Sequence, residues 1–579
     1  MSSDQINTSR RGALGLIGGA GIGLAAGCAQ GSEMATTDPI SSTDLSSAER
    51  VFGVNYTEAE REQMLRGMED WVGRLEALRA YAKPNALAPA CVFDPRLPGA
   101  SYEMTSGGVT GLPTAPGAVA DTDTDLAFAP VWQLSAWISS GAITSEALTQ
   151  IYLARIEAYD SDLRAYITVM ADQALDQARM RDRERAAGQI RSALHGIPYA
   201  LKDIVDIAGV RATWGAQIYR DRIASQTATI AHMLEDAGAV LLGKTSVGAL
   251  AYGDIWFDGV CRNPFNPSEG SSGSSAGSAS ATAAGLCAFS IGTETLGSIV
   301  SPSQRCGTAG LRPSFGRVSR HGAMALCWSL DKIGPIVRHV ADAALVMEVI
   351  NGYDANDPSS LQTQFGADLS ADLSGLRLGY DPEAFEQATD ADRAALDVAR
   401  ALGVELVETR PDLNGLPVDS LFSILEVEAA AAFEHVTLDN SDDELRWQGD
   451  NAWPNTFRRA RFHSAIDILN ADRVRRRAME IVHTTFEGVD AMIGPNLANQ
   501  MLLLTNFTGQ PQLIFRSGFE DRVPTALFGS DEPAPTEPIS LPHGTSLWAP
   551  LFKEDTILAL GHELETRLGV ATTRPTAFT

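Results

Sequence analysis

The stretch "EGSSGSSAGSASATAAG" (residues 269–285) decides how the rest of this chain is interpreted. It consists almost entirely of Gly, Ser, Ala and Thr, which is the composition of a flexible linker. The apolar segment "LCAFSIGTE" (286–294) follows it directly and predicts a buried strand. Small residues beside a patterned strand are also found where the backbone packs closely around a ligand. The stretch is therefore either a hinge between domains or the backbone of a site.

Two further segments favour a site. Downstream, "TETLGS" (293–298) is a Gly-containing turn that can gather backbone N–H groups ahead of Ser298, as the stabilisation of an oxyanion requires. Upstream, "LHGIPYALKD" (194–203) predicts a short strand that leads into a turn at Lys202. Taken alone, Lys202 beside Asp203 fits a surface ion pair, and Ser298 fits an ordinary turn residue. The two segments carry chemistry only if the fold brings them together.

A competing motif overlaps the Ser/Gly stretch. Residues 273–277 match G-x-S-x-G, the pattern of a nucleophile elbow, with Ser275 as its serine. An elbow needs a strand immediately before it, and "NPFNPSEGSS" (263–272) predicts none. We therefore reject this motif.

The composition is that of a large globular protein, with 579 residues, 44% hydrophobic and 20% charged. The formal net charge of −27 argues against a nucleic-acid partner and against docking on anionic lipid. Six cysteines without a C-x-x-C pair indicate neither a disulfide framework nor a zinc site. We expect no metal. From about residue 126, predicted helices alternate with apolar runs, which favours an α/β architecture with helices on both faces of a sheet.

The N-terminal segment resembles an export signal. In residues 1–28, Arg10 and Arg11 precede a weakly apolar, Gly-rich run that is too short for a stable membrane span and ends in "LAAGC" at Cys28. The pattern is typical of a twin-arginine signal with a lipoprotein-like cleavage site, so we expect a periplasmic or cell-envelope location and a possible lipid anchor at Cys28. A disordered tail with a chance arginine pair is the alternative.

Two segments separate this signal from the α/β region. Residues 29–50 are rich in Ser, Thr and Asp and predict a flexible tether. Residues 51–125 predict a helical extension, which begins with a capping box at Thr57 and Glu60. Apolar residues follow at the spacing of one helix and predict a packing surface rather than a cofactor site: Met64, Met68, Trp71, Leu75 and Leu78. Residues 126–575 form the predicted catalytic domain.

Taken in order, the lysine segment, "GSSAGSASATAAG" and "GTETLGS" resemble the blocks that define the amidase signature family. The segments "FTGQP" (507–511) and "LWAPLFKEDTILALGHELE" (547–565) are similar to its closing segments. The resemblance covers roughly residues 126–572. It implies the amidase signature fold, which is an α/β fold with a large mixed β-sheet core covered by helices on both faces. It implies no cofactor.

The resemblance also implies the roles of individual residues. Ser298 matches the nucleophile, Ser274 the bridging serine beside a cis peptide bond, and Lys202 the base. Burial near the sheet would lower the pKa of the lysine and leave it neutral enough to accept a proton. The implied oxyanion hole consists of the backbone N–H groups of Thr295, Leu296, Gly297 and Ser298. Ser275 and Thr293 match supporting hydrogen-bond partners.

The sequence departs from the family pattern at several positions. Glu294 stands where Asp is common, Leu296 where Gly is common, and Val300 where Arg is common. These departures predict an altered polar network behind the site and a reshaped pocket, with the three catalytic residues unchanged. Trp328 is larger than the residue usual at its place, near the expected substrate channel or simply in the core. Cys306 matches a structural cysteine.

We therefore predict an amidase that hydrolyses a carboxylic amide to an acid and ammonia or an amine, with an acyl-enzyme on Ser298. The substrate is a small-molecule amide or an amidated peptide. The alternatives are an esterase, because the same path accepts esters, and the glutaminase-type subunit that amidates misacylated transfer RNA. That subunit works in the cytoplasm with partner subunits, which an export signal disfavours. A cell-envelope binding lipoprotein without turnover is the alternative outside enzymology.

Overall fold

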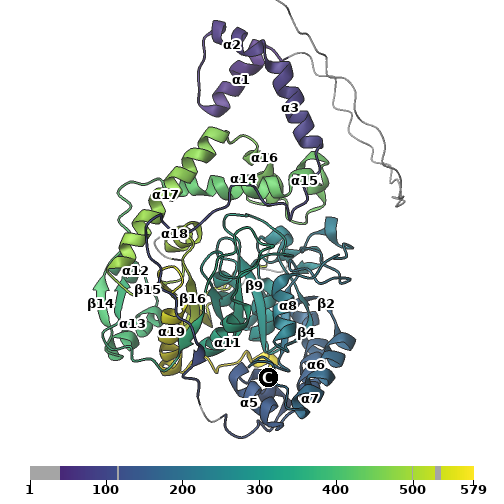
Figure 1. Cartoon of the computed structure of the whole chain (residues 1–579), viewed down its shortest axis with the longest axis vertical. Coiled ribbons are helices and arrows are strands. Elements are labelled where there is room, and N and C mark those ends of the chain that lie inside the picture. The colour runs from purple at the N-terminus through teal and green to yellow at the C-terminus, as the bar shows by residue number, and fades with distance from the viewer. Residues whose placement is uncertain (1–39, 114–115, 498–499, 528–535) are drawn as a thin grey trace, which may run out of the picture. The chain divides into compact units, whose positions relative to one another are not determined.

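An eleven-stranded mixed sheet forms the framework of the computed structural model, which describes residues 40–113, 116–497, 500–527 and 536–579 (Figure 1). In spatial order its strands are β14 (Glu405–Glu408), β13 (Arg377–Tyr380), β15 (Ala491–Pro495), β17 (Ile539–Trp548), β16 (Gln512–Arg522), β10 (Ala309–Arg312), β11 (Lys332–Val337), β9 (Phe289–Glu294), β3 (Pro198–Lys202), β4 (Val240–Thr245) and β2 (Tyr166–Val169). Four neighbouring pairs, β3–β4, β3–β9, β13–β14 and β13–β15, are parallel, and the others are antiparallel. The predicted mixed sheet is confirmed.

Helices cover both faces of this sheet, as strand β16 demonstrates. A Cβ at Gly561 of α19 (Glu554–Leu568) would lie 2.5 Å from Leu513 Cδ2, whereas a Cβ at Gly307, which caps α10 (Val300–Cys306), would lie 3.2 Å from Arg516 Cδ. Side chains three positions apart on a strand point to opposite faces, so α10 and α19 lie on opposite sides. Helix α9 (Ala276–Ala283) packs with α10. Helices α11 (Val340–Ile350) and α13 (Asp390–Ala401) pack with α19, and these three are labelled in Figure 1. The α/β class is therefore confirmed.

The helices that follow the N-terminal region are α4 (Asp123–Phe128), α5 (Val131–Ser140), α6 (Ser145–Leu163), α7 (Ala171–Ala186), α8 (Thr229–Asp236), α9 (Ala276–Ala283), α10 (Val300–Cys306), α11 (Val340–Ile350), α12 (Pro382–Glu386), α13 (Asp390–Ala401), α14 (Phe422–Ala432), α15 (Glu434–Leu438), α16 (Trp453–Ala460), α17 (Ala465–Glu487), α18 (Met501–Thr508) and α19 (Glu554–Leu568). Three two-stranded sheets lie outside the main sheet: β1 (Gly108–Thr110) with β12 (Gly366–Asp368), β5 (Ile255–Trp256) with β6 (Gly259–Val260), and β7 (Arg262–Asn263) with β8 (Asn266–Gly270).

Two central strands position the site. The strands β3 and β9 are buried along their whole length, as their apolar residues require. They pair in parallel, with Leu201 opposite Ile291. Parallel neighbours end at the same edge of a sheet, where α/β proteins commonly bind ligands. The end of β3 at Lys202 and the turn after β9 therefore lie side by side.

The predicted tether is wrong for its second half. Helix α1 (Ser42–Phe52) begins inside it and has a capping box between Ser41 and Asp44. The Ser and Asp side chains that suggested disorder here satisfy the free N–H groups at the start of a helix. The rest of the tether and the signal (residues 1–28, with Cys28) lie outside the described residues. The contacts divide the chain into two units, Met1–Ile40 and Ser41–Thr579. The helices and strands named in this section belong to the second unit.

The helical extension forms two helices where the apolar spacing predicted one. Helix α2 (Glu58–Leu65) has the predicted capping box of Thr57 and Glu60, and α3 (Met68–Ala80) begins only after Gly67. Neither helix buries a residue, so their apolar side chains do not form the expected packing surface within the chain.

Neither a membrane span nor a metal cluster occurs in the part of the chain that the structure describes. Among those residues, no helix combines the length and the apolar character that crossing a bilayer requires. No group of three or more His, Cys, Asp and Glu side chains within the same described ranges could hold a metal ion.

Candidate active site

The Ser/Gly stretch is a packed part of the catalytic core. Its second half is helix α9, in which every residue is buried. A Cβ at Gly273 would lie 1.9 Å from Gly253 O, and a Cβ at Gly277 would lie 2.1 Å from Ala165 O. The peptide bond between Gly273 and Ser274 is cis, as the resemblance implied. The small residues are therefore required by close backbone contacts, and the stretch is not a linker.

Lys202 lies at the centre of the serine cluster. Its side chain is fully buried at the end of β3, and Nζ donates to Ser274 Oγ (2.9 Å), Ser275 Oγ (3.0 Å) and Thr293 Oγ1 (2.8 Å). Burial lowers the pKa of Lys202 from 10.5 to about 7, although the charges of Asp331 and Glu294 act in the opposite direction. The alternative of a surface ion pair is excluded, because the lysine is buried and its neighbour Asp203 pairs with Lys244 (3.1 Å).

The hydrogen bonds of Ser275 give it a supporting place. Its hydroxyl donates to Thr293 O (3.0 Å) and accepts from Thr293 N (3.1 Å) and from Lys202. Since its one proton is engaged with Thr293 O, Ser275 has none to give to the lysine. Ser274 is thus the serine of this pair that can exchange a proton with Lys202.

The prediction that no strand precedes the G-x-S-x-G motif is wrong. The structure places strand β8 (Asn266–Gly270) shortly before the motif. Within the described residues, β8 pairs with β7 alone, in a two-stranded ribbon outside the main sheet. A segment that contains Pro and Gly can form such a short ribbon. Ser275, the serine of the motif, is fully buried and faces Lys202. The motif therefore does not present an exposed nucleophile.

Ser298 lies in the turn between β9 and α10 and is 8% exposed. Its carbonyl accepts from Ser275 N (3.1 Å), which links the turn to the serine cluster. Within the described residues, the Ser298 hydroxyl makes no hydrogen bond. Catalytic hydrogen bonds commonly form only once substrate is bound, and this hydroxyl is free to turn toward a ligand.

The turn offers four free N–H groups. In the described part of the chain, the N–H groups of Thr295, Leu296, Gly297 and Ser298 donate to no other group. Gly297 has φ of +86°, a left-handed conformation in which a side chain would be strained. These four groups are the ones that the resemblance assigns to an oxyanion hole.

The Glu294 carboxylate accepts hydrogen bonds from the N–H groups of the two residues that follow Ser298. Its Oε2 accepts from Ile299 N (2.9 Å) and Val300 N (3.1 Å), which leaves only the preceding four unused. Its Oε1 accepts from Arg312 (2.9 Å) and Asn506 (2.9 Å), and Glu294 and Arg312 are both fully buried. Burial raises the pKa of Glu294, but the charge and hydrogen bond of Arg312, together with the hydrogen bonds from Asn506 and Ile299 N, hold the pKa below its ordinary value.

A polar network therefore lies behind the turn, and that it differs from the network of other family members stays a prediction. The longer acid reaches the backbone beyond Ser298, and its cation is Arg312 from β10 rather than residue 300. Arg312 did not emerge from the sequence, because nothing in "GLRPSFG" distinguishes a buried arginine from an exposed one. Cys306 is buried, which raises its pKa well above 9.0, as expected for a structural thiol.

Two cavities open at the turn. The first, called here the serine cavity, measures about 240 Å³ and contains Ser298. Apolar and aromatic side chains form part of its wall, among them Leu296, Tyr252, Leu425 and Trp453. Polar and charged side chains form the rest, among them Glu426, Asn451 and Arg459. Leu296 thus faces the pocket, as its departure from Gly suggested.

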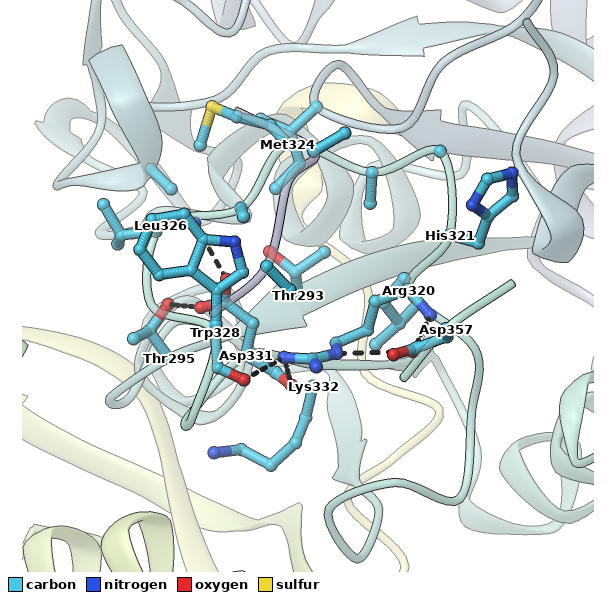
Figure 2. Close-up of a pocket in the computed structure, with 18 of the residues that line it drawn as sticks. Thr293, Thr295, Arg320, His321, Met324, Leu326, Trp328, Asp331, Lys332 and Asp357 are labelled. Atoms are coloured by element: carbon cyan, nitrogen blue, oxygen red, sulfur yellow. Dashed lines mark hydrogen bonds and ion pairs between the residues drawn. The ribbon is translucent and has the colours of Figure 1, made fainter. Parts of the chain in front are cut away.

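The second cavity measures about 70 Å³ and is shown in Figure 2. It is called here the strap cavity, because Ala86 and Ala88 from the segment before the catalytic domain form part of its lining. Thr293, Trp328 and Asp331 line it, so Trp328 lies in a cavity wall beside the site. Asp331 accepts from Thr295 Oγ1 (2.6 Å) and Leu326 N (2.8 Å), and it thereby joins the turn to the wall of this cavity.

Comparison with known proteins agrees with this geometry. The sequence model of the family described as Amidase matches residues 147–558. The A subunit of glutamyl-tRNA(Gln) amidotransferase from Anaeromyxobacter sp. (strain K) is 33% identical over 470 residues, covering 76% of this chain and 96% of that protein. The corresponding protein of Geobacter sulfurreducens is 34% identical over 468 residues, covering 73% and 94%.

A solved structure is also similar over most of both chains. Native peptide amidase from Stenotrophomonas maltophilia is 28% identical with a TM-score of 0.64, covering 76% of this chain and 97% of that one. The match over residues 147–558 contains Lys202, the Ser/Gly stretch and Ser298. The chain belongs to the amidase signature family and is an amide-hydrolysing enzyme.

Proposed function

We propose that this enzyme hydrolyses a carboxylic amide through an acyl-enzyme on Ser298, with Lys202 as the base and Ser274 as the proton relay. One observation carries the proposal: Lys202 Nζ lies 2.9 Å from Ser274 Oγ and has a pKa of about 7. A lysine with its ordinary pKa would be almost entirely protonated at neutral pH and could accept no proton. Here a large fraction is neutral at that pH.

In the proposed acylation step, the proton passes along these three residues. Neutral Lys202 takes the proton of Ser274, which takes the proton of Ser298, and Ser298 Oγ forms a bond to the carbonyl carbon of the amide. The carbonyl oxygen becomes an oxyanion and accepts from the free N–H groups of residues 295–298, each such donor contributing roughly 2.7–4 kcal/mol. The C–N bond then breaks as Ser274 gives its proton to the leaving nitrogen and recovers one from Lys202.

Deacylation uses the same groups in reverse. Water gives a proton through Ser274 to Lys202, and its oxygen attacks the ester carbon. A second oxyanion forms at the same N–H groups and collapses, releasing the carboxylic acid and returning the proton to Ser298. Every proton that enters the relay leaves it, so the cycle needs no cofactor.

The serine cavity favours an apolar substrate. Tyr252 lies between Trp447 (ring centroids 4.9 Å apart) and Trp453 (5.0 Å), which makes an aromatic wall beside Ser298. Such walls bind apolar and aromatic groups. We propose small-molecule amides or amidated peptides with an aliphatic or aromatic acyl part, and the similarity to a peptide amidase supports this class.

We also propose that the enzyme is exported. Arg10, Arg11 and the run that ends at Cys28 support a twin-arginine signal with a lipid anchor at Cys28. The site would then act on amides in the periplasm or cell envelope.

A substrate panel tests the proposal. The chain is incubated with aliphatic and aromatic primary amides, amidated peptides, matched esters and glutamine, and the release of ammonia, amine or alcohol is followed. We expect the highest kcat/KM among amides for an apolar acyl group, and none for Ser298→Ala. A marked preference for glutamine would instead support the glutaminase-type alternative, in line with the similarity to glutamyl-tRNA(Gln) amidotransferases. Turnover of esters alone would indicate an esterase, and an inert protein that no fluorophosphonate labels would indicate a binding lipoprotein.

A further inference from the structure

The two cavities meet at the oxyanion turn. Both are lined by Thr295, Ala251 and Leu326, so the two cavities adjoin at these residues, next to Ser298. The serine cavity is the larger, at about 240 Å³ against about 70 Å³ for the strap cavity. An acyl half and an amine half that lie in different cavities therefore have different amounts of space.

The proton relay decides which half enters which cavity. The leaving nitrogen receives its proton from the Lys202–Ser274 pair and must lie on that side of the carbonyl. Thr293 lines the strap cavity, and its Oγ1 lies 2.8 Å from Lys202 Nζ. The amine half consequently faces the strap cavity, and the acyl half faces the serine cavity. This assignment rests on the proposed function.

The outer wall of the strap cavity comes from the N-terminal extension. Residues 83–110, called here the N-terminal strap, follow α3 and contribute Ala86 and Ala88 to the lining. The strap precedes residues 147–558, the part of the chain that the family model matches. This wall is thus an addition of this chain to the matched domain.

The strap is fixed to the catalytic domain on both sides of this wall. The Asn85 side chain accepts from Ala325 N (2.8 Å) and donates to Ala325 O (2.8 Å), so one amide engages both polar groups of a residue that also lines the cavity. Before it, Lys83 pairs with Glu434 (3.3 Å). After it, Phe93 packs under the guanidinium of Arg475, 3.4 Å from the ring centroid. A wall held at three points has a defined position.

The other walls of the strap cavity are also fixed. Arg320 donates to Trp328 O (2.8 Å) and Asp331 O (3.3 Å) and faces Asp357 (3.5 Å), as the dashed lines in Figure 2 indicate. These bonds hold the loop that contains Trp328 and Asp331. With both sides fixed, the cavity is small, and its volume of about 70 Å³ leaves room for only a few water-sized groups.

From this we infer that the N-terminal strap forms the outer wall of the leaving-group subsite and restricts the enzyme to amides of ammonia or of small amines. The methyl groups of Ala86 and Ala88 set the limit. Larger side chains at these positions reduce the subsite further without touching Ser298, Ser274 or Lys202.

Two substrates with the same acyl group test this inference: a primary amide and its N-propyl derivative. We expect Ala86→Trp to raise KM for the N-propyl amide about tenfold or more, while KM for the primary amide stays within about twofold. Ala88→Leu should act in the same direction with a smaller effect. Leu87→Trp is the matched control, because Leu87 is 54% exposed and is not among the residues that line the cavity. It should leave both KM values unchanged.

The outcomes separate this inference from the proposed function. Fluorophosphonate labelling and turnover of the primary amide report the catalytic residues in every variant. If these persist while Ala86→Trp and Ala88→Leu treat the two amides as the wild type does, the strap is not the wall of the subsite. Equal effects of Leu87→Trp and Ala86→Trp also overturn the inference. A wild type that is neither labelled nor active overturns the proposed function instead.

Discussion

Replacing Lys202 with methionine is expected to lower kcat/KM for the preferred amide by about 10⁴-fold or more, the scale observed when a residue of a catalytic triad is removed. Methionine keeps the length and apolar stem of the lysine but cannot accept a proton. Ser274 then has nothing to receive its proton, and the Ser298 hydroxyl remains a weak nucleophile. Steady-state kinetics on both proteins, with thermal unfolding to establish that the variant folds, measures the effect.

The pH dependence distinguishes loss of a base from loss of packing. Burial lowers the pKa of Lys202 to about 7, and only the neutral amine can act. Wild-type kcat/KM should therefore rise about tenfold per pH unit below 7 and level off above it. The residual activity of Lys202→Met should lack this rise. A variant that keeps more than about a tenth of the wild-type activity, with the same profile, would contradict the assignment of the base.

Replacing Arg312 with methionine is expected to destabilise the fold by about 3–5 kcal/mol, the usual effect of removing one partner of a buried ion pair. Arg312 and Glu294 are both fully buried, and the variant would leave the Glu294 carboxylate without its cation. Arg312 also donates to Gln512 Oε1 (2.9 Å) and Thr505 Oγ1 (2.8 Å), whose hydrogen bonds would be lost as well. Denaturant unfolding measures the change in free energy.

Two companions make this stability experiment specific. Arg400→Met removes an exposed arginine that pairs with Asp397, and it should leave the unfolding curve unchanged because exposed pairs contribute little. The double variant Arg312→Met with Glu294→Gln removes both charges and should recover part of the loss. If Arg312→Met unfolds at the wild-type denaturant concentration, the pair does not hold the turn in the way described here.

The sequence predicts the site better than it predicts its surroundings. Lys202, Ser274 and Ser298 lie in short blocks whose order is readable, and the apolar residues of β3 and β9 are sufficient to predict that the lysine is buried. The fold then brings the end of β3, with Lys202, beside the turn after β9, which contains Ser298, because β3 and β9 are parallel neighbours. Pairings formed by the tertiary fold are not readable in this way. Asn85 meets Ala325 across 240 positions, and no local pattern marks either residue.

The N-terminal errors have a different cause. Composition predicts disorder for residues that form α1, because Ser and Asp serve both loops and helix caps, and the capping box of Ser41 and Asp44 lies among them. Helical spacing suggested one helix where Gly67 separates α2 from α3. Glycine is a poor helix former, and an exposed segment has no packing to compensate for it.

The central claim, an acyl-enzyme on Ser298, is tested most directly by trapping it. The chain is mixed with an aromatic ester or amide of slow deacylation, quenched in acid within the first turnover and digested, and the peptides are measured by mass spectrometry. We expect the peptide that contains Ser298 to gain the mass of the acyl group in the wild type, and Ser298→Ala to show no adduct. An adduct on Ser274 or Ser275, or turnover of the amide by Ser298→Ala, would contradict it.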